Sequence, residues 1–206
     1  MSRIDFPLYL VTDRHQTKGR PLVPLLREAL TAGVRAIQLR EKDLDARAFV
    51  ELATEVRALT RRRGALLFIN DRVDVALAVE ADGVHLPGTG MPASVVRRLI
   101  GPHRLIGVSA HSVEEAVQAA SQGADFVVLG PVYDTPSKRL YGAPIGTNLL
   151  GEAVRRCRVP VFAIGGVTAE RVAELRAAGV SGFALISAVL SADSIGEAAT
   201  RLLSAW

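Results

Sequence analysis

The sequence predicts a single (β/α)8 barrel, a TIM barrel, that spans residues 1–206 as one domain. Eight short, almost continuously apolar runs alternate with eight longer segments of helical period, and no Pro/Gly-rich linker interrupts the series. Strands that are covered on both faces have this apolar character. Eight such units in series favour a closed barrel over an open sheet. An open dinucleotide-binding sheet would need G-x-G-x-x-G after its first strand, and LVTDRHQTKG lacks it.

The expected strands share a short length and a run of apolar residues. In chain order they are Leu8–Asp13, Ala36–Glu41, Leu66–Asn70, Gly83–Leu86, Leu105–Ala110, Phe126–Pro131, Val161–Gly166 and Gly182–Ser187. The expected helices have apolar residues three and four positions apart: VPLLREAL, FVELATEVRALT, RVDVALAV, ASVVRRLI, VEEAVQAA, LLGEAVRRC, AERVAELRAA and SIGEAATRLLSA. Glycines between several helices and the next strand supply the left-handed helix stop that these short connections need.

The composition favours a globular protein that acts on a small anion. Hydrophobic residues make up 49% of the chain and charged residues 22%, and the N-terminus carries no secretory signal pattern. We therefore expect a cytoplasmic protein, without a membrane span. The net charge is +4, but aromatic residues are only 5% of the chain and do not interleave with the basic ones, so we expect no nucleic-acid partner. A modest positive charge suits a phosphorylated small molecule.

Polar residues gather at the predicted carboxyl ends of the strands. In barrels of this kind, functional residues lie at those ends and in the loops that follow. The polar strand ends are Gln38, Arg40, Glu41 and Lys42; Asn70 and Asp71; Ser109 and His111; Thr135, Pro136, Ser137 and Lys138; Gly165 and Gly166; and Ser187. This end of the barrel is therefore the predicted active face.

Three cations on this face suggest a clamp for a pyrophosphate. Arg40 and Lys42 are two residues apart, so on a strand both side chains point to the same side, and Lys138 follows the sixth strand. Cations held this close are suited to a polyphosphate between them. The alternative is that Arg40 and Lys42 form surface ion pairs with Glu41 or Asp43.

Other strand ends offer further ligands. Asn70 can bond phosphate oxygens and Asp71 can hold Mg²⁺, although Asn-Asp before a helix is also a common N-cap. Gly165 and Gly166, with Ile186 and Ser187, end the seventh and eighth strands, where many barrels bind phosphate through backbone N–H groups; the alternative is a pair of turn glycines.

Two residues after the fifth strand have open roles. His111 is either catalytic or a helix-entry residue, because Ser112 and Glu115 form a capping-box pattern beside it. Ser109 either donates to a phosphate oxygen or satisfies a turn. His85, inside the fourth predicted strand, is interpreted as structural.

At these strand ends the chain resembles the thiamine phosphate synthase/TenI superfamily over nearly its whole length. The matching stretches are IQLREK, FINDRVDVALAVEADGVHL, IGVSAHSVEEA, LGPVYDTPSK, VFAIGGV and ALISAV, in that order. The resemblance implies phosphorylated pyrimidine and thiazole substrates. It assigns the pyrimidine diphosphate to Gln38, Leu39, Arg40, Glu41, Lys42, Asn70, Ser109 and Lys138, and Mg²⁺ to Asp71. It assigns the thiazole phosphate to Thr135, Pro136, Ser137, Gly165, Gly166, Ile186 and Ser187.

The sequence departs from the superfamily's patterns at two positions. Synthases usually carry a second Mg²⁺ carboxylate shortly after the fourth strand, where this chain has Gly90, so Asp71 is left to bind Mg²⁺ with phosphate oxygens and water. The TenI-type tautomerase has its catalytic histidine just after Gly130, where this chain has Pro131.

The resemblance therefore implies three candidate functions. The first is a synthase that joins hydroxymethylpyrimidine diphosphate to thiazole phosphate and releases pyrophosphate, with Arg40, Lys42, Lys138 and Mg²⁺ stabilising the leaving group. The second is a tautomerase of the thiazole phosphate, with His111 or Asp134 as the base. The third is a non-catalytic binder of thiazole or thiamin phosphates. Whether the chain forms a homo-oligomer is left open.

Overall fold

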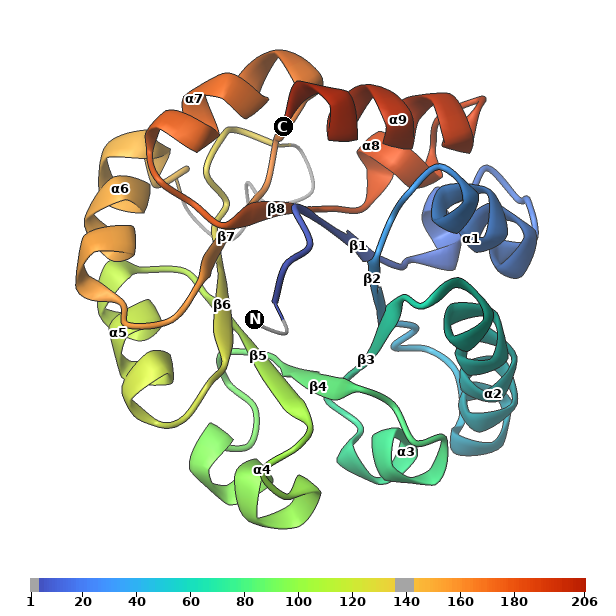
Figure 1. The fold of residues 1–206 in the computed structure, drawn as a ribbon. Helices are drawn as coiled ribbons and strands as arrows, with labels where there is room; N and C mark the ends of the chain where they lie inside the picture. Colours follow the sequence, from blue (N-terminus) through green and yellow to red (C-terminus); the bar gives the residue numbers. More distant parts are fainter. Residues whose placement is uncertain (1–3, 136–142) are drawn as a thin grey trace.

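The computed structural model describes residues 4–135 and 143–206, and it confirms the predicted (β/α)8 barrel. Eight parallel strands close in chain order, with β1 paired to both β2 and β8. The strands are β1 (Leu8–Val11), β2 (Ala36–Leu39), β3 (Leu66–Asn70), β4 (Gly83–Leu86), β5 (Leu105–Ala110), β6 (Phe126–Leu129), β7 (Val161–Ile164) and β8 (Gly182–Leu185). Figure 1 shows the strand ring enclosed by an outer ring of helices.

Each strand is followed by helical structure that covers the outside of the barrel. The α-helices are α1 (Leu22–Thr31), α2 (Ala46–Arg63), α3 (Val73–Ala78), α4 (Ala93–Ile100), α5 (Val113–Ser121), α6 (Gly146–Arg156), α7 (Val172–Ala177), α8 (Ser187–Leu190) and α9 (Ile195–Ala205). Two 3₁₀ turns, η1 (Arg14–Gln16) and η3 (Ala169–Arg171), lie in the loops after β1 and β7. Within the described ranges, no helix is long and apolar enough to cross a membrane.

Five strands end two residues earlier than expected, because their last polar residues leave the sheet. The backbone N–H of Arg40 donates to the Thr12 side chain at 2.9 Å instead of joining the strand ladder. Gly165 and Gly166 have φ values of +95° and +66°, which a strand cannot contain. Ser187 was expected to end a strand and instead begins α8. Arg40 and Lys42 therefore lie in a loop, and their shared direction does not follow from strand alternation.

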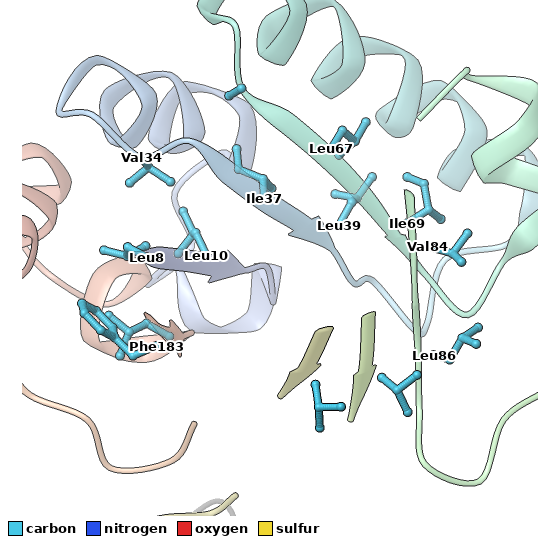
Figure 2. Close-up of a cluster of buried hydrophobic side chains, with 14 of the residues drawn as sticks. Leu8, Leu10, Val34, Ile37, Leu39, Leu67, Ile69, Val84, Leu86 and Phe183 are labelled. Carbon is cyan, nitrogen blue, oxygen red and sulfur yellow. The ribbon is translucent and has the colours of Figure 1, made fainter. Parts of the chain in front are cut away.

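Two separate hydrophobic layers hold the barrel. The outer layer lies between strands and helices, and Figure 2 shows Ile37, Leu67 and Val84 among its buried side chains. The inner layer fills the barrel with the rings of Phe6, Tyr9, Phe68, Phe126 and Phe162, whose neighbouring centroids lie 5.2 to 6.4 Å apart. The segment before β1, which carries Phe6, crosses the middle of the ring (Figure 1). The interior is therefore a packed core, with room for ligands only at its mouth.

Two similar Arg–Asp ion pairs stabilise the opposite, amino-terminal end of the barrel. Asp82, just before β4, accepts hydrogen bonds from the Leu67 backbone N–H at 2.8 Å and from Arg57 on α2 at 2.6 Å. One unit later, Asp125 accepts from the Ile106 N–H and from Arg97 on α4. Each carboxylate thus joins a helix to the start of a neighbouring strand. Contacts at this end of the barrel serve stability, because functional residues of this fold lie at the carboxyl end.

Candidate active site

The parallel, closed order of the strands brings three of the predicted site residues, Arg40, Asn70 and Ser109, to one rim. Asn70 is the last residue of β3, Ser109 is the fifth of six residues in β5, and Arg40 follows β2 directly. Because β2 to β5 are successive neighbours in the barrel, these residues share one arc of its carboxyl end. All three side chains are half-buried, which suits groups that line a mouth.

The carboxylates beside Arg40 and Lys42 are taken by other partners. Both guanidinium nitrogens of Arg14 bind Asp43, at 2.6 and 2.5 Å, and His15 binds the same carboxylate at 3.0 Å. Desolvation is the largest single effect on the Asp43 carboxyl and raises its pKa, but the hydrogen bonds from His15 and Arg14 together outweigh it and hold the pKa below its usual range. Glu41 accepts from the Thr12 hydroxyl at 2.6 Å and from the Arg14 N–H at 3.0 Å.

Arg40 and Lys42 are consequently left without acidic partners among residues 4–135 and 143–206. The alternative prediction, that Arg40 and Lys42 form surface ion pairs with Glu41 or Asp43, is wrong, because Arg14 binds both carboxylates. Lys42 is exposed, whereas the half-buried Arg40 comes near enough to His85 to lower the pKa of its imidazole. Arg40 is thus a half-buried cation that directly follows β2 at the carboxyl end of the barrel, a position suited to attracting an anion.

Three neighbours of Arg40 in the predicted site are placed elsewhere. The Leu39 side chain is fully buried in the outer hydrophobic layer (Figure 2), so only its backbone faces the mouth region. Glu41 is 5% exposed, and its carboxylate accepts hydrogen bonds from Thr12 and Arg14. Gln38 is 3% exposed and forms a side-chain hydrogen bond with Tyr9 inside the barrel. These residues support the rim more directly than they line it.

A buried polar chain lies beneath the mouth, and sequence analysis missed it. The Tyr9 hydroxyl lies 3.4 Å from Nδ1 of His85, and Nε2 of His85 lies 2.9 Å from the Ser109 hydroxyl. Burial lowers the pKa of His85 to about 3, with a smaller contribution from Arg40, and burial also raises the pKa of Tyr9. His85 is therefore neutral at physiological pH. The alternation of side chains along a strand could have predicted this contact. His85 lies two residues after Gly83 and faces the barrel interior, as does Asn70, its partner on β3.

Asn70 and Asp71 stand together at the end of β3. Asp71 adopts φ +62°, a left-handed conformation that is uncommon for residues other than glycine, and its N–H donates to the His85 carbonyl at 2.9 Å. The carboxylate is exposed. Asp71 does not cap α3, whose N-cap is Arg72 without a side-chain bond. In the part of the chain that the structure describes, no three His, Cys, Asp or Glu residues form a metal-binding group.

The Gly165–Gly166 turn is held from the side opposite the barrel. The guanidinium of Arg171 donates to the Gly166 carbonyl and lies 4.3 Å from the ring centroid of Tyr133. A Cβ on Gly165 would lie 2.7 Å from the Pro131 backbone, so the turn packs tightly on the loop after β6. On the next strand, Ile186 precedes α8 and the Ser187 side chain is exposed. The backbone at the ends of β7 and β8 is thus available at the rim.

The structure gives His111 a feature of each predicted role, the helix-entry residue and the catalytic residue. The capping bond is present, since the Ser112 hydroxyl accepts from the Glu115 N–H at 3.1 Å. The His111 ring is exposed, and its Nδ1 lies 2.7 Å from the Gly130 carbonyl oxygen. A carbonyl can only accept, so Nδ1 carries the proton and Nε2 of a neutral ring is an acceptor. The imidazole therefore reaches from β5 to the end of β6.

The remaining predicted residues belong to the loop after β6. Thr135 is half-buried at the end of the first described range. Pro136, Ser137 and Lys138 lie outside the described residues. The convergence of Lys138 with Arg40 and Lys42 therefore stays a prediction.

Comparisons with known proteins assign the chain to a family. Residues 8–189 match the family described as thiamine monophosphate synthase. A thiamine-phosphate synthase of Roseiflexus castenholzii is 48% identical over 95% of this chain and 86% of its own length. A thiamine-phosphate synthase of Chloroflexus aurantiacus is 44% identical over 97% of this chain and 92% of its own.

A solved structure agrees with these relatives. The thiamine phosphate pyrophosphorylase of Pyrococcus furiosus superposes with a TM-score of 0.90 at 40% identity, covering 98% of this chain and 96% of its own. The resemblance drawn from the strand ends is confirmed: the chain belongs to the thiamine monophosphate synthase family.

Proposed function

We propose that this protein is a thiamine phosphate synthase, a transferase that joins hydroxymethylpyrimidine diphosphate to thiazole phosphate and releases pyrophosphate. The relatives and the solved structure named above carry this activity in their names. The single structural observation that supports it is Arg40, a half-buried cation at the barrel mouth whose neighbouring carboxylates are bound to Arg14. An anionic leaving group would supply the acidic partner that Arg40 lacks among the described residues.

The chemistry requires charge stabilisation and no protein nucleophile. The bond between the pyrimidine methylene carbon and the diphosphate oxygen breaks, and its electron pair leaves with the pyrophosphate. The thiazole nitrogen then donates its lone pair to that carbon. Arg40 and Lys42 stabilise the growing negative charge, and Ser109 donates a hydrogen bond to it. Asn70 bonds a neighbouring oxygen, and Lys138 joins the clamp.

Mg²⁺ fits this site as an ion shared with the substrate. Mg²⁺ is commonly bound by one or two carboxylates together with substrate phosphates and water. Asp71 supplies one exposed carboxylate at the rim, and Gly90 supplies none. Asp71 would hold the ion, which when bound would neutralise diphosphate charge. The thiazole phosphate would bind opposite, between Thr135 and the backbone at Gly165, Gly166, Ile186 and Ser187.

An assay of pyrophosphate release tests the proposal. It compares variants of the half-buried Arg40 and of the exposed Lys42. The wild-type protein is expected to release pyrophosphate from the two substrates in a Mg²⁺-dependent reaction. Arg40→Ala is expected to lower kcat/KM about 100-fold, because charge-assisted bonds to a partly buried cation are worth about 1.5–3 kcal/mol. Lys42→Ala, on an exposed cation, should cost less than Arg40→Ala. Absence of pyrophosphate release would refute the synthase.

One observation supports a second candidate, the thiazole phosphate tautomerase. His111 presents its Nε2 as an acceptor beside Gly130, the place after which that enzyme type carries its catalytic histidine. The tautomerase would interconvert thiazole phosphate isomers in EDTA, and His111→Ala would abolish this reaction. Binding of thiazole phosphate without turnover in either assay would leave the non-catalytic binder.

The cellular location and the oligomeric state of the protein stay predictions. We expect a cytoplasmic location, which fractionation of the native organism would test. Self-association into a homo-oligomer would be tested by light scattering coupled to gel filtration.

A further inference from the structure

Four polar side chains from four strands cross the barrel interior directly below the mouth. Gln38 on β2 bonds Tyr9 on β1, Tyr9 approaches Nδ1 of His85 on β4 at 3.4 Å, and Nε2 of His85 lies 2.9 Å from the hydroxyl of Ser109 on β5. Tyr9 and His85 are fully buried, and Ser109 is half-buried at the rim. This row of polar side chains therefore connects the aromatic core to the proposed diphosphate site.

The direction of the hydrogen bonds can be read from the Tyr9 end. The fully buried Tyr9 hydroxyl needs an acceptor for its proton, and Nδ1 of His85 lies within hydrogen-bond distance of it. Burial raises the pKa of Tyr9, so its hydroxyl keeps its proton. That proton points to the neighbouring acceptor, Nδ1 of His85. The separation of 3.4 Å between the Tyr9 hydroxyl and Nδ1 of His85 is longer than the 2.9 Å between Nε2 of His85 and the Ser109 hydroxyl.

The His85 ring cannot change its orientation easily. The ring centroids of Tyr9 and Phe126 lie 5.6 and 5.9 Å from that of His85. A Cβ on Gly107 would lie 2.6 Å from Nδ1 of His85, so the ring fills the space that this glycine leaves. A neutral imidazole carries one proton, and if Nδ1 accepts from Tyr9 the proton is on Nε2. Nε2–H then donates to the Ser109 oxygen.

We propose that Tyr9 and His85 are positioning residues that direct the Ser109 hydroxyl proton toward the anion bound at the barrel mouth. The inference rests on the proposed function for the identity of that anion, the diphosphate. A serine hydroxyl has one proton, and once its oxygen accepts from His85 the proton is free for a ligand. The site then holds a donor that is already oriented before substrate binds, and no reorganisation is needed during the reaction.

The histidine tautomer tests the orientation without any activity measurement. The chain contains four histidines, so the ¹⁵N spectrum of histidine-labelled protein is assigned for His85 by comparison with His85→Gln. The expected spectrum shows a neutral ring protonated at Nε2. A ring protonated at Nδ1 would overturn the proposal, because Ser109 would then have to donate to Nε2. This result holds whichever reaction the protein catalyses.

A double-mutant cycle tests whether Tyr9 acts through Ser109. Tyr9→Phe is expected to weaken the binding of inorganic pyrophosphate with Mg²⁺, measured by calorimetry, about tenfold, the value of one hydrogen bond to a charged group. In the Ser109→Ala background, Tyr9→Phe should have no further effect on binding. Equal loss in both backgrounds, or no loss in either, would contradict the proposal. Thermal unfolding of all four proteins separates these effects from a general loss of stability, which should be the same in both backgrounds.

Conservative replacement of His85 completes the test. His85→Gln places an amide nitrogen at the Nε2 position and should restore pyrophosphate affinity relative to His85→Leu, which has no donor. Ser121→Ala removes an exposed hydroxyl on α5 that bonds only the Gln118 carbonyl, and serves as the control. If wild-type protein binds no pyrophosphate, the synthase proposal fails, while the tautomer still decides how Ser109 is oriented.

Discussion

The guanidinium of Arg20 donates to the carbonyl oxygen of Leu190, the last residue of α8, at an Nη2–O distance of 3.0 Å. The same side chain donates to the carbonyls of Ala192 at 2.7 Å and Asp193 at 3.2 Å. These carbonyls belong to the last residue of a four-residue helix and to residues just after it, so Arg20 both binds them and places a cation at the carboxyl end of α8. The loop after β1 thus holds the helix that begins at Ser187.

Arg20→Ala is expected to destabilise the protein by about 2 kcal/mol, because it leaves several partly buried carbonyls unpaired. It should also raise KM for thiazole phosphate more than KM for pyrimidine diphosphate, since α8 adjoins only the proposed thiazole phosphate site. Urea unfolding and steady-state kinetics measure the two effects. Lys18→Ala, which removes an exposed ion pair with Asp193, is the control and should change neither. Equal changes in both KM values would show that Arg20 does not act through α8.

The Arg57–Asp82 pair at the opposite end of the barrel is expected to matter for stability alone. Asp82→Ala leaves the Leu67 N–H and the Arg57 guanidinium unpaired, and both groups are largely buried. The expected loss is about 2–4 kcal/mol. Asp74→Ala breaks the exposed Arg72–Asp74 pair, which has similar two-point geometry, and should cost less than about 0.5 kcal/mol. Similar losses for the two variants, or a changed KM in Asp82→Ala, would contradict this division of roles.

The fold could be predicted because its signal is local. The strands Leu66–Asn70, Gly83–Leu86 and Leu105–Ala110 have the expected bounds, since apolar runs and flanking glycines define them without reference to the rest of the chain. The helix Ser187–Leu190 was missed because four residues are too few to show a helical period. Its carboxyl end is bound by Arg20, which is distant in sequence.

The site could be predicted only in part, because adjacency in sequence was taken for adjacency in space. Gln38, Leu39 and Glu41 were grouped with Arg40, yet Leu39 faces the outer layer and Glu41 binds Arg14. The pairing of Arg14 with Asp43 joins two loops and has no sequence pattern, and it leaves Arg40 and Lys42 without an acidic partner in the part of the chain that the structure describes.

The buried His85 is expected to make stability depend on pH. Its pKa is about 3 in the folded protein and about 6.5 when unfolded, so between these values the unfolded chain binds one more proton. Stability from this residue is complete above about pH 6.5 and falls as the pH decreases toward 3. Between about pH 7 and pH 4.5 the wild-type protein should lose about 2–3 kcal/mol through His85. Urea unfolding of His85→Gln at both pH values should show a loss smaller by that amount, and an equal loss would contradict the assignment.

Gly90 offers a direct test of the incomplete metal site. Gly90→Asp is expected to lower the Mg²⁺ concentration at half-maximal activity, because a second carboxylate would join Asp71. A Cβ at this position would lie 2.9 Å from Cγ and 3.1 Å from the carbonyl oxygen of Pro87, so the loop must shift and the variant should also be less stable. Thr89→Asp adds the same charge at the neighbouring exposed residue and is the control for electrostatic attraction. If both variants lower the Mg²⁺ requirement equally, the effect is one of general charge and Gly90 does not mark the missing ligand.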